Sequence, residues 1–126
     1  MKTENSKIAN SRVYDLEERT ARFGENLILL CRKLKQDVVT RPLISQLIRS
    51  GTSIGANYME ANGASSKKDF INKIFICKKE AQETKHWLRM LTSCEGGDLN
   101  FELLKQWKEC QELTLIFQKI VSSARK

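Results

Sequence analysis

Residues 66–94 read SKKDFINKIFICKKEAQETKHWLRMLTSC, and their apolar side chains recur in steps of four and three. The positions that carry this repeat are Phe70, Ile74, Cys77, Ala81, Thr84, Leu88 and Leu91. Side chains with this spacing form one stripe along a helix, as they do where helices pack side by side. The segment therefore predicts a long amphipathic helix against which the rest of the chain packs.

Three further segments have the same period. Their repeat positions are Leu16, Thr20, Phe23, Leu27, Leu30 and Leu34; Ile44, Leu47, Gly51, Ile54, Tyr58 and Ala61; and Leu103, Trp107, Cys110, Thr114, Phe117 and Val121. Short connections between such segments favour neighbouring antiparallel helices. We therefore predict an all-α, antiparallel, up-down-up-down four-helix bundle with helices at about 15–34, 42–62, 66–94 and 100–122. Residues 1–126 form a single domain, in which 1–12 are expected to be a loose N-terminal arm.

Several local signals refine these boundaries. Pro42 disfavours a helical conformation at Arg41, so the second helix is expected to start at the proline. Asp98 or Asn100 is expected to cap the fourth helix. Asp15 and Arg19 have the spacing of an ion pair within the first helix.

Two glycines inside the second segment need a reason, because glycine destabilises a helix interior. Gly51 and Gly55 lie one turn apart on the same face. We predict that a neighbouring helix approaches closely there. The alternative, a phosphate-binding turn, lacks the preceding strand and the Gly-Lys-Ser/Thr ending that such a loop requires.

The composition bears on partners and on compartment. The chain has a net charge of +7 and a pI near 9.4, which favours polyanions or an acidic protein as partners. Its four cysteines have no C-x-x-C spacing, and the N-terminal residues lack a secretory signal. No stretch has the length and apolarity of a membrane span. These features predict a cytoplasmic protein with reduced thiols and no membrane association.

Catalytic and metal-binding patterns are weak. His86 is the one histidine and is expected to face solvent, although Glu83 and His86 have the spacing of a carboxylate–histidine metal motif. No nucleophile and base are placed together by the sequence. We predict that the protein is not an enzyme and has no cofactor or metal.

The basic residues are spread along the chain, without the interleaved aromatic residues of single-strand-binding platforms. We consider seven of them candidates for nucleic-acid contacts: Arg32, Lys33, Lys67, Lys68, Lys78, Lys85 and Arg89. If nucleic acid binds, phosphate contacts are expected to dominate. The polar residues of the second and third helices could instead form a solvated face, a subunit interface or a ligand contact.

One run is diagnostic of a known family: QLIRSGTSIGANYMEANGASSKKDFINKIFICKKEAQETKHWLRML, residues 46–91. It resembles the bacterial four helix bundle protein family, also called the 23S ribosomal RNA intervening-sequence protein family. The hallmark R-S-x-x-S-I-x-x-N-x-x-E-A, then S-x-x-D-F, then K-E-A-x-E-T-x-x-W-L, is present without departure. Its polar residues that could form a functional face or subunit interface are Arg49, Ser53, Asn57, Glu60, Lys79, Glu80, Glu83 and Trp87.

The resemblance implies a left-handed bundle that assembles into a homopentamer, and it implies no established activity. The family is distantly similar to the accessory variability determinant proteins of diversity-generating retroelements, which are basic pentamers that bind nucleic acid. We therefore expect a non-enzymatic, oligomeric protein that associates with RNA or DNA, with RNA favoured, through a diffuse basic surface. The alternative is a protein–protein adaptor or assembly scaffold whose ring binds another polypeptide.

Overall fold

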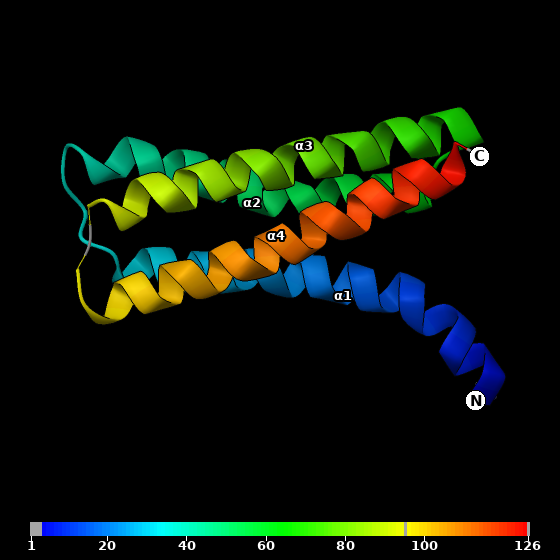
Figure 1. Ribbon diagram of the computed structural model, residues 1–126, viewed down its shortest axis with the longest axis horizontal. Helices are drawn as coiled ribbons and strands as arrows, with labels where there is room; N and C mark the ends of the chain where they lie inside the picture. Colours follow the sequence, from blue (N-terminus) through cyan, green and yellow to red (C-terminus); the bar gives the residue numbers. More distant parts are fainter. Residues whose placement is uncertain (1–3, 95, 126) are drawn as a thin grey trace.

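Four helices account for most of the chain in the computed structural model. It describes the backbone of residues 4–94 and 96–125, and the side chains of 15–94 and 96–125. The helices are α1 (Glu4–Lys33), α2 (Thr40–Asn62), α3 (Lys67–Thr92) and α4 (Asp98–Ala124), and the described residues contain no strand. Successive helices run in alternating directions along one long axis (Figure 1). The predicted four-helix bundle is thus confirmed, while its left-handed sense stays a prediction.

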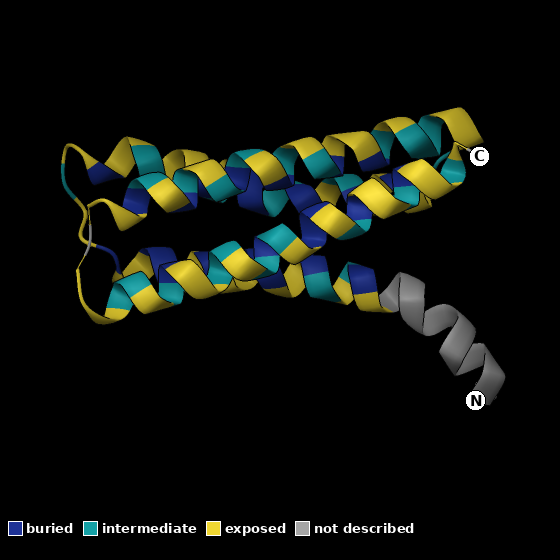
Figure 2. Ribbon diagram, viewed as in Figure 1, coloured by how far each residue is buried: buried dark blue, intermediate teal, exposed yellow. Residues whose placement is uncertain are grey.

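The core follows the predicted repeat closely. Every repeat position of the first two segments is buried, and Figure 2 shows buried residues along the inner faces of the helices. In α3 and α4 the repeat is buried except at Phe70 and Trp107, which are half-buried and pack against the rim of the core. Leu27, Leu47, Leu88 and Phe117, one from each helix, are fully enclosed. The heptad period therefore identifies the surfaces that the helices share.

Close approach of α1 explains the glycines of α2. A Cβ atom built on Gly51 would clash with Cδ1 of Leu27, and one built on Gly55 would lie 3.3 Å from Oγ1 of Thr20. Both contacts come from α1, as the predicted close approach requires. The absence of side chains at these positions lets α1 and α2 pack with little separation.

The start of α1 corrects one expectation. The helix begins at Glu4 rather than near residue 15, so residues 4–12 are helical instead of a loose arm. The sequence contains neither glycine nor proline between Glu4 and Phe23, and so nothing in it ends the helix there. Residues 1–3 lie outside the described part of the chain.

The start of α2 corrects a second expectation, because the helix begins at Thr40 and includes Arg41. The Oδ1 atom of Asp37 accepts hydrogen bonds from the backbone N–H groups of Val39 and Thr40, at 2.9 and 2.8 Å. In return, Thr40 Oγ1 accepts one from the Asp37 N–H at 2.9 Å. This reciprocal arrangement starts the helix before the proline, and the backbone bonds lower the pKa of Asp37. Pro42 lies in the first turn, where its missing N–H costs little.

The start of α4 differs from expectation as well. Neither Asp98 nor Asn100 caps it; Gly97 occupies the cap position with φ of 75°, and no side chain completes the cap. A positive φ of this size strains residues with a side chain, which explains a glycine at this point. In contrast, α3 has a side-chain cap, because Ser66 Oγ accepts a hydrogen bond from the Asp69 N–H at 3.0 Å.

A bidentate ion pair joins the first helix to the last. Arg19 pairs with Glu109 of α4 through two hydrogen bonds of 2.7 Å, and not with Asp15 as expected. The hydrogen bond to Glu109 raises the pKa of Arg19, and two parallel bonds of this kind are stronger than one. The pair therefore fastens α1 to α4.

Three of the four cysteines behave as apolar core residues. Cys31, Cys77 and Cys110 are buried and Cys94 is exposed, with all four thiols free. Burial raises the pKa of Cys31 to about 11 and those of Cys77 and Cys110 to about 12. Because only the thiolate reacts readily, both burial and a raised pKa protect Cys31, Cys77 and Cys110 from thiol reagents, whereas Cys94 is exposed.

We expect a thiol reagent at pH 8 to label Cys94 quickly and the other three cysteines only after unfolding. The raised thiol pKa values also stabilise the folded state at a pH below about 8.5, the pKa of a thiol in the unfolded chain. This contribution is lost as the pH rises through the folded-state pKa values. Counting labelled thiols with and without denaturant by mass spectrometry checks the first point. Rapid native labelling of two or more thiols would contradict the described core.

Candidate nucleic-acid interface

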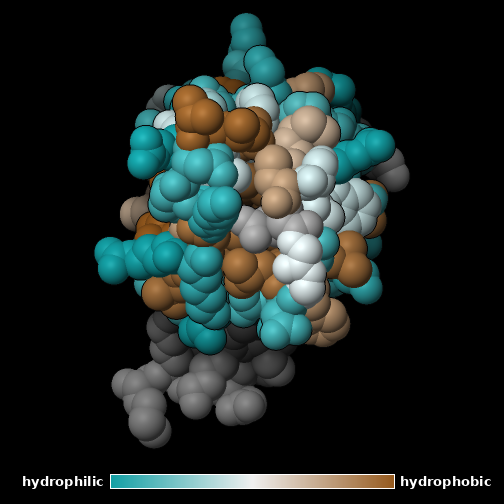
Figure 3. All heavy atoms as spheres, turned by 90° about the vertical axis from the view of Figure 1, so that its left-hand side faces the viewer, coloured by the Kyte–Doolittle hydropathy of each residue, from teal (hydrophilic) through white to brown (hydrophobic). Residues whose placement is uncertain are grey.

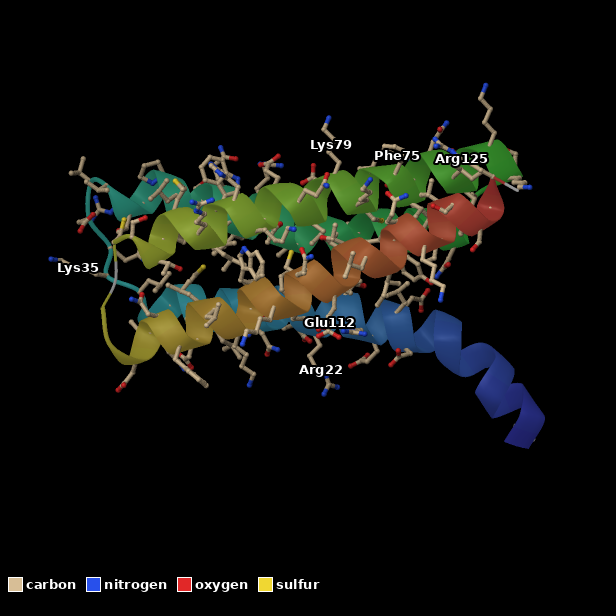
Figure 4. All side chains as sticks on the ribbon, in the orientation of Figure 1. Arg22, Lys35, Phe75, Lys79, Glu112 and Arg125 are labelled. Carbon is tan, nitrogen blue, oxygen red and sulfur yellow. The ribbon has the colours of Figure 1, made fainter. Side chains whose placement is uncertain are left out.

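The side of the bundle where α3 meets α4 carries a cluster of cations around an exposed ring. Phe75 of α3 is 42% exposed. The Nζ atom of Lys78 lies 5.4 Å from its ring centroid, and the Arg125 guanidinium carbon lies 5.2 Å from it. Figure 4 shows Phe75 and Arg125 close together where α3 begins and α4 ends. Both distances are within the range of cation–π attraction.

A second cluster lies further along the same two helices. Lys85 Nζ is 5.4 Å from the ring centroid of Trp107 in α4 and donates a hydrogen bond to Oε1 of Gln111. Lys85 and Trp107 are both half-buried. These contacts hold the lysine over the indole and fix its position across the groove between the helices.

Arg89 continues the series by one turn of α3. It is exposed and, with Trp107, lines a hollow near the α3–α4 connection. From Phe75 to Arg89 the helix rises about 20 Å, at about 1.5 Å per residue. We refer to Phe75, Lys78, Lys85, Arg89, Trp107 and Arg125 together as the α3–α4 stripe.

The α3–α4 stripe overturns the expectation that aromatic residues are not interleaved with the basic ones. Two rings alternate with four cations, but they belong to two helices. Spacings of three, seven and four residues separate Phe75, Lys78, Lys85 and Arg89. Such spacings predict that these residues share one face of a helix, so the α3 part of the stripe could be predicted from the sequence. The contributions of Trp107 and Arg125 were missed because they depend on which face α4 presents to α3.

The remaining basic candidates lie at the end of α1 and at the start of α3. Arg32 and Lys33 lie in the last turn of α1, where Lys33 pairs with Glu102 at 3.1 Å. Lys67 and Lys68 are exposed in the first turn of α3. The structure therefore brings three of the seven candidates, Lys78, Lys85 and Arg89, into the stripe. Lys67 and Lys68 continue the same edge toward the start of α3, since Lys67 is five helical turns before Lys85. Arg32 and Lys33 lie on another helix.

The polar residues of the family hallmark form a network between α2 and α3. Ser53 Oγ donates to Oε2 of Glu80 at 2.7 Å, and Arg49 reaches the same oxygen at 3.3 Å. Arg49 also pairs with Glu83, which accepts at 2.9 Å from the indole N–H of Trp87. These groups satisfy one another, so the network's evident effect is to fix the register of α2 against α3.

Asn57, Glu60 and Lys79 lie outside this network. Asn57 donates from Nδ2 to the Ser53 carbonyl at 2.8 Å, within its own helix. Glu60 is exposed and 3.6 Å from Lys73. Lys79 is exposed and points away from the bundle (Figure 4). Five of the eight hallmark residues therefore bond across α2 and α3: Arg49, Ser53, Glu60, Glu80 and Glu83. Trp87 supports Glu83 from within α3, and Asn57 and Lys79 make no such bond.

Other kinds of site have little support on this surface. His86 is exposed, as predicted, and contacts the Trp87 ring edge-on at a centroid distance of 4.9 Å. Among the described residues, no group of three or more histidines, cysteines and carboxylates could hold a metal ion. In the same part of the chain, none of the helices has the length and apolarity to cross a membrane.

These features define a four-helix-bundle protein with a mixed aromatic and basic edge. The family described as 23S rRNA-intervening sequence protein matches residues 12–119, and the chain belongs to this family. The structure is similar to the crystal structure of a protein of unknown function from the S23 ribosomal protein family of Bacteroides thetaiotaomicron. The two share 32% identity and a TM-score of 0.73 over 84% of this chain and 97% of the other. None of the curated proteins matches the chain.

Proposed function

We propose that this protein is a non-enzymatic, oligomeric helical-bundle protein that associates with RNA through the α3–α4 stripe. The observation that carries the proposal is the alternation of Phe75 and Trp107 with four cations along one edge. Aromatic side chains stack on unpaired bases, while lysine and arginine neutralise phosphates. The description of the family, which names an intervening sequence of 23S rRNA, favours RNA over DNA as the partner.

The charge of the stripe is not cancelled locally. Lys78 and Arg125 contact the Phe75 ring, and Lys85 contacts an indole and an amide. The ion pairs found among the described residues lie elsewhere, on Arg19, Arg22, Lys33, Arg49 and Lys73. A phosphate approaching the stripe would therefore meet cations that are not already held by carboxylates.

We expect replacement of Lys78, Lys85 and Arg89 together by glutamine to weaken binding of structured RNA about 100-fold at low salt. Each cation that contacts a phosphate contributes roughly one to the slope of log affinity against log salt, so the slope should fall by roughly two to three. Filter binding at several salt concentrations measures both quantities. Circular dichroism confirms that the variant is folded.

The matched control replaces Arg32, Arg41 and Lys105 by glutamine. These exposed residues lie on α1, on α2 and on the side of α4 that faces α1, so the variant loses the same number of charges outside the stripe. We expect it to change the affinity less than about threefold, because the global charge acts only through a screened field. Equal losses in the two variants would show that binding depends on net charge alone. No retention of RNA by the unaltered protein at low salt would refute the proposal.

The oligomeric part of the proposal is supported by a groove between α1 and α2. It has a volume of about 610 Å³ and is lined by small residues, by Ile28 and Met59, and by three carboxylates, Glu17, Glu18 and Glu25. Its small residues are Thr20, Ala21, Gly24, Thr52, Gly55 and Ala56. An acidic groove with apolar walls suits a second copy of a chain whose net charge is +7.

We expect light scattering to give a mass that is a multiple of 14.5 kDa, and a pentamer by the family resemblance. Ala56→Glu should lower that mass by adding bulk and a fourth carboxylate to the groove, whereas Gln118→Glu on exposed α4 should not. A measured mass equal to that of one chain would contradict the proposed oligomer. The α1–α2 groove would then favour the adaptor function, and a partner polypeptide should still be captured after nuclease treatment.

A further inference from the structure

The hollow at one end of the α3–α4 stripe has the size and the lining of a small-molecule site. It measures about 650 Å³, within the usual range of about 300–1,000 Å³ for ligand pockets. Its walls come from the end of α3 and the first half of α4: Arg89, Thr92, Ser93, Asn100, Leu104 and Trp107. Figure 3 looks onto this end of the bundle, where hydrophobic and hydrophilic residues are intermixed.

The walls combine a flat aromatic ring with groups that form directional hydrogen bonds. Trp107 is held in place by Lys85, and Leu104 adds an apolar surface that is 48% exposed. Thr92 donates its hydroxyl proton to the Leu88 carbonyl at 2.8 Å, which leaves its oxygen free to accept. Such a lining suits a planar heterocycle that stacks on one face and bonds along its edge.

Asn100 supplies an unusual feature. Its Oδ1 is the one buried side-chain N or O atom without a hydrogen-bond partner among the described residues. Buried polar atoms are nearly always paired, so this amide would gain a hydrogen bond if its side chain turned toward the hollow that Asn100 lines. An amide offers both a donor and an acceptor, which matches the edge of a nucleobase.

Arg89 lies at the mouth of the hollow and is exposed. No carboxylate pairs with it in the part of the chain that the structure describes. A guanidinium in this position can hold a phosphate in a bidentate manner while the attached base enters the hollow.

We propose that this hollow binds one unpaired nucleobase of an RNA strand, with Trp107 stacking on the base, Asn100 bonding to its edge and Arg89 holding its phosphate. The inference rests on the proposed function, because the α3–α4 stripe must first bring the strand to the hollow. It goes further by assigning a base-binding site and a requirement for unpaired RNA.

Tryptophan fluorescence tests the site directly. The chain has two tryptophans, so in the Trp87→Phe variant the emission comes from Trp107 alone. Trp87 itself bonds to Glu83, on the side of α3 that faces α2. The probes are a single-stranded RNA oligomer, the same oligomer in a perfect duplex, and a single strand without bases. We expect saturable quenching by the single strand only, while filter binding at low salt retains all three probes.

A pocket-filling variant provides the second arm. Thr92→Phe leaves the charge unchanged and places a ring in the hollow from its exposed rim. We expect it to weaken single-strand binding about tenfold, the size of one base–aromatic stack, and duplex binding less than twofold. Ser122→Phe, exposed at the other end of α4, is the matched control and should alter neither.

The outcomes separate the two proposals. Retention of RNA without quenching, or equal quenching by duplex and single strand, would overturn the nucleobase site and leave the α3–α4 stripe as a phosphate-binding surface. Equal weakening of single-strand and duplex binding in Thr92→Phe would overturn it as well. Absence of retention for every probe would overturn both the site and the proposed function.

Discussion

Replacement of Phe117 by alanine is expected to lower the free energy of unfolding by about 3–5 kcal/mol. Phe117 is fully buried in α4, and its ring centroid lies 6.3 Å from that of Tyr58 in α2. The substitution removes apolar contacts and leaves a cavity that rigid neighbouring helices can fill only in part. Because domains of this size have a total stability of about 5–15 kcal/mol, the loss is a large fraction of the whole.

Denaturant titration followed by circular dichroism measures the effect, and thermal unfolding should show a midpoint lowered by about 10–20 °C. Phe101→Ala is the matched control, because it is the same substitution in the same helix at a side chain that is 73% exposed. We expect it to change stability by less than about 0.5 kcal/mol. Similar losses in the two variants would mean that α4 does not present Phe117 to the core.

The core could be predicted from the sequence because helical periodicity is a local property. Leu27, Leu47 and Leu88 were assigned to the interior by spacing alone, and all three are enclosed. The helix starts were less predictable, since they depend on competition between local groups. At Asp37 the reciprocal bonds with Thr40 outweigh the restriction that Pro42 imposes on Arg41. A D-x-x-T pattern ahead of the proline was the available signal.

The candidate site was predictable only within a single helix. Lys78, Lys85 and Arg89 share a face of α3 by their spacing, so they could be grouped before the fold was known. The contacts of Lys85 with Trp107 and of Phe75 with Arg125 depend on the rotation of α4 about its own axis, which the heptad fixes only approximately. For the same reason the sequence indicated a polar face around Arg49 without showing that it pairs with Glu80 and Glu83.

Replacement of Leu27 by alanine should lower stability by about 2–5 kcal/mol, and the effect should depend on the residue at position 51. Leu27 is fully buried and fills the space left by the absent side chain of Gly51. In the native protein, Gly51→Ala should therefore destabilise by about 1–3 kcal/mol through overpacking. Once Leu27 is alanine, the methyl group at position 51 enters a cavity, and Gly51→Ala should instead stabilise by about 1 kcal/mol through the higher helix propensity of alanine.

A double-mutant cycle measured by chemical denaturation tests this change of sign. The coupling between the two positions should amount to at least about 1 kcal/mol, whereas distant sites add within about 0.5 kcal/mol. Gly24→Ala is the matched control, because a Cβ atom there would meet Thr52 Cγ2 at an ordinary 3.6 Å. It should be neutral or stabilising in both backgrounds. If Gly51→Ala were equally harmless with and without the Leu27 side chain, α1 and α2 would not approach closely at this point.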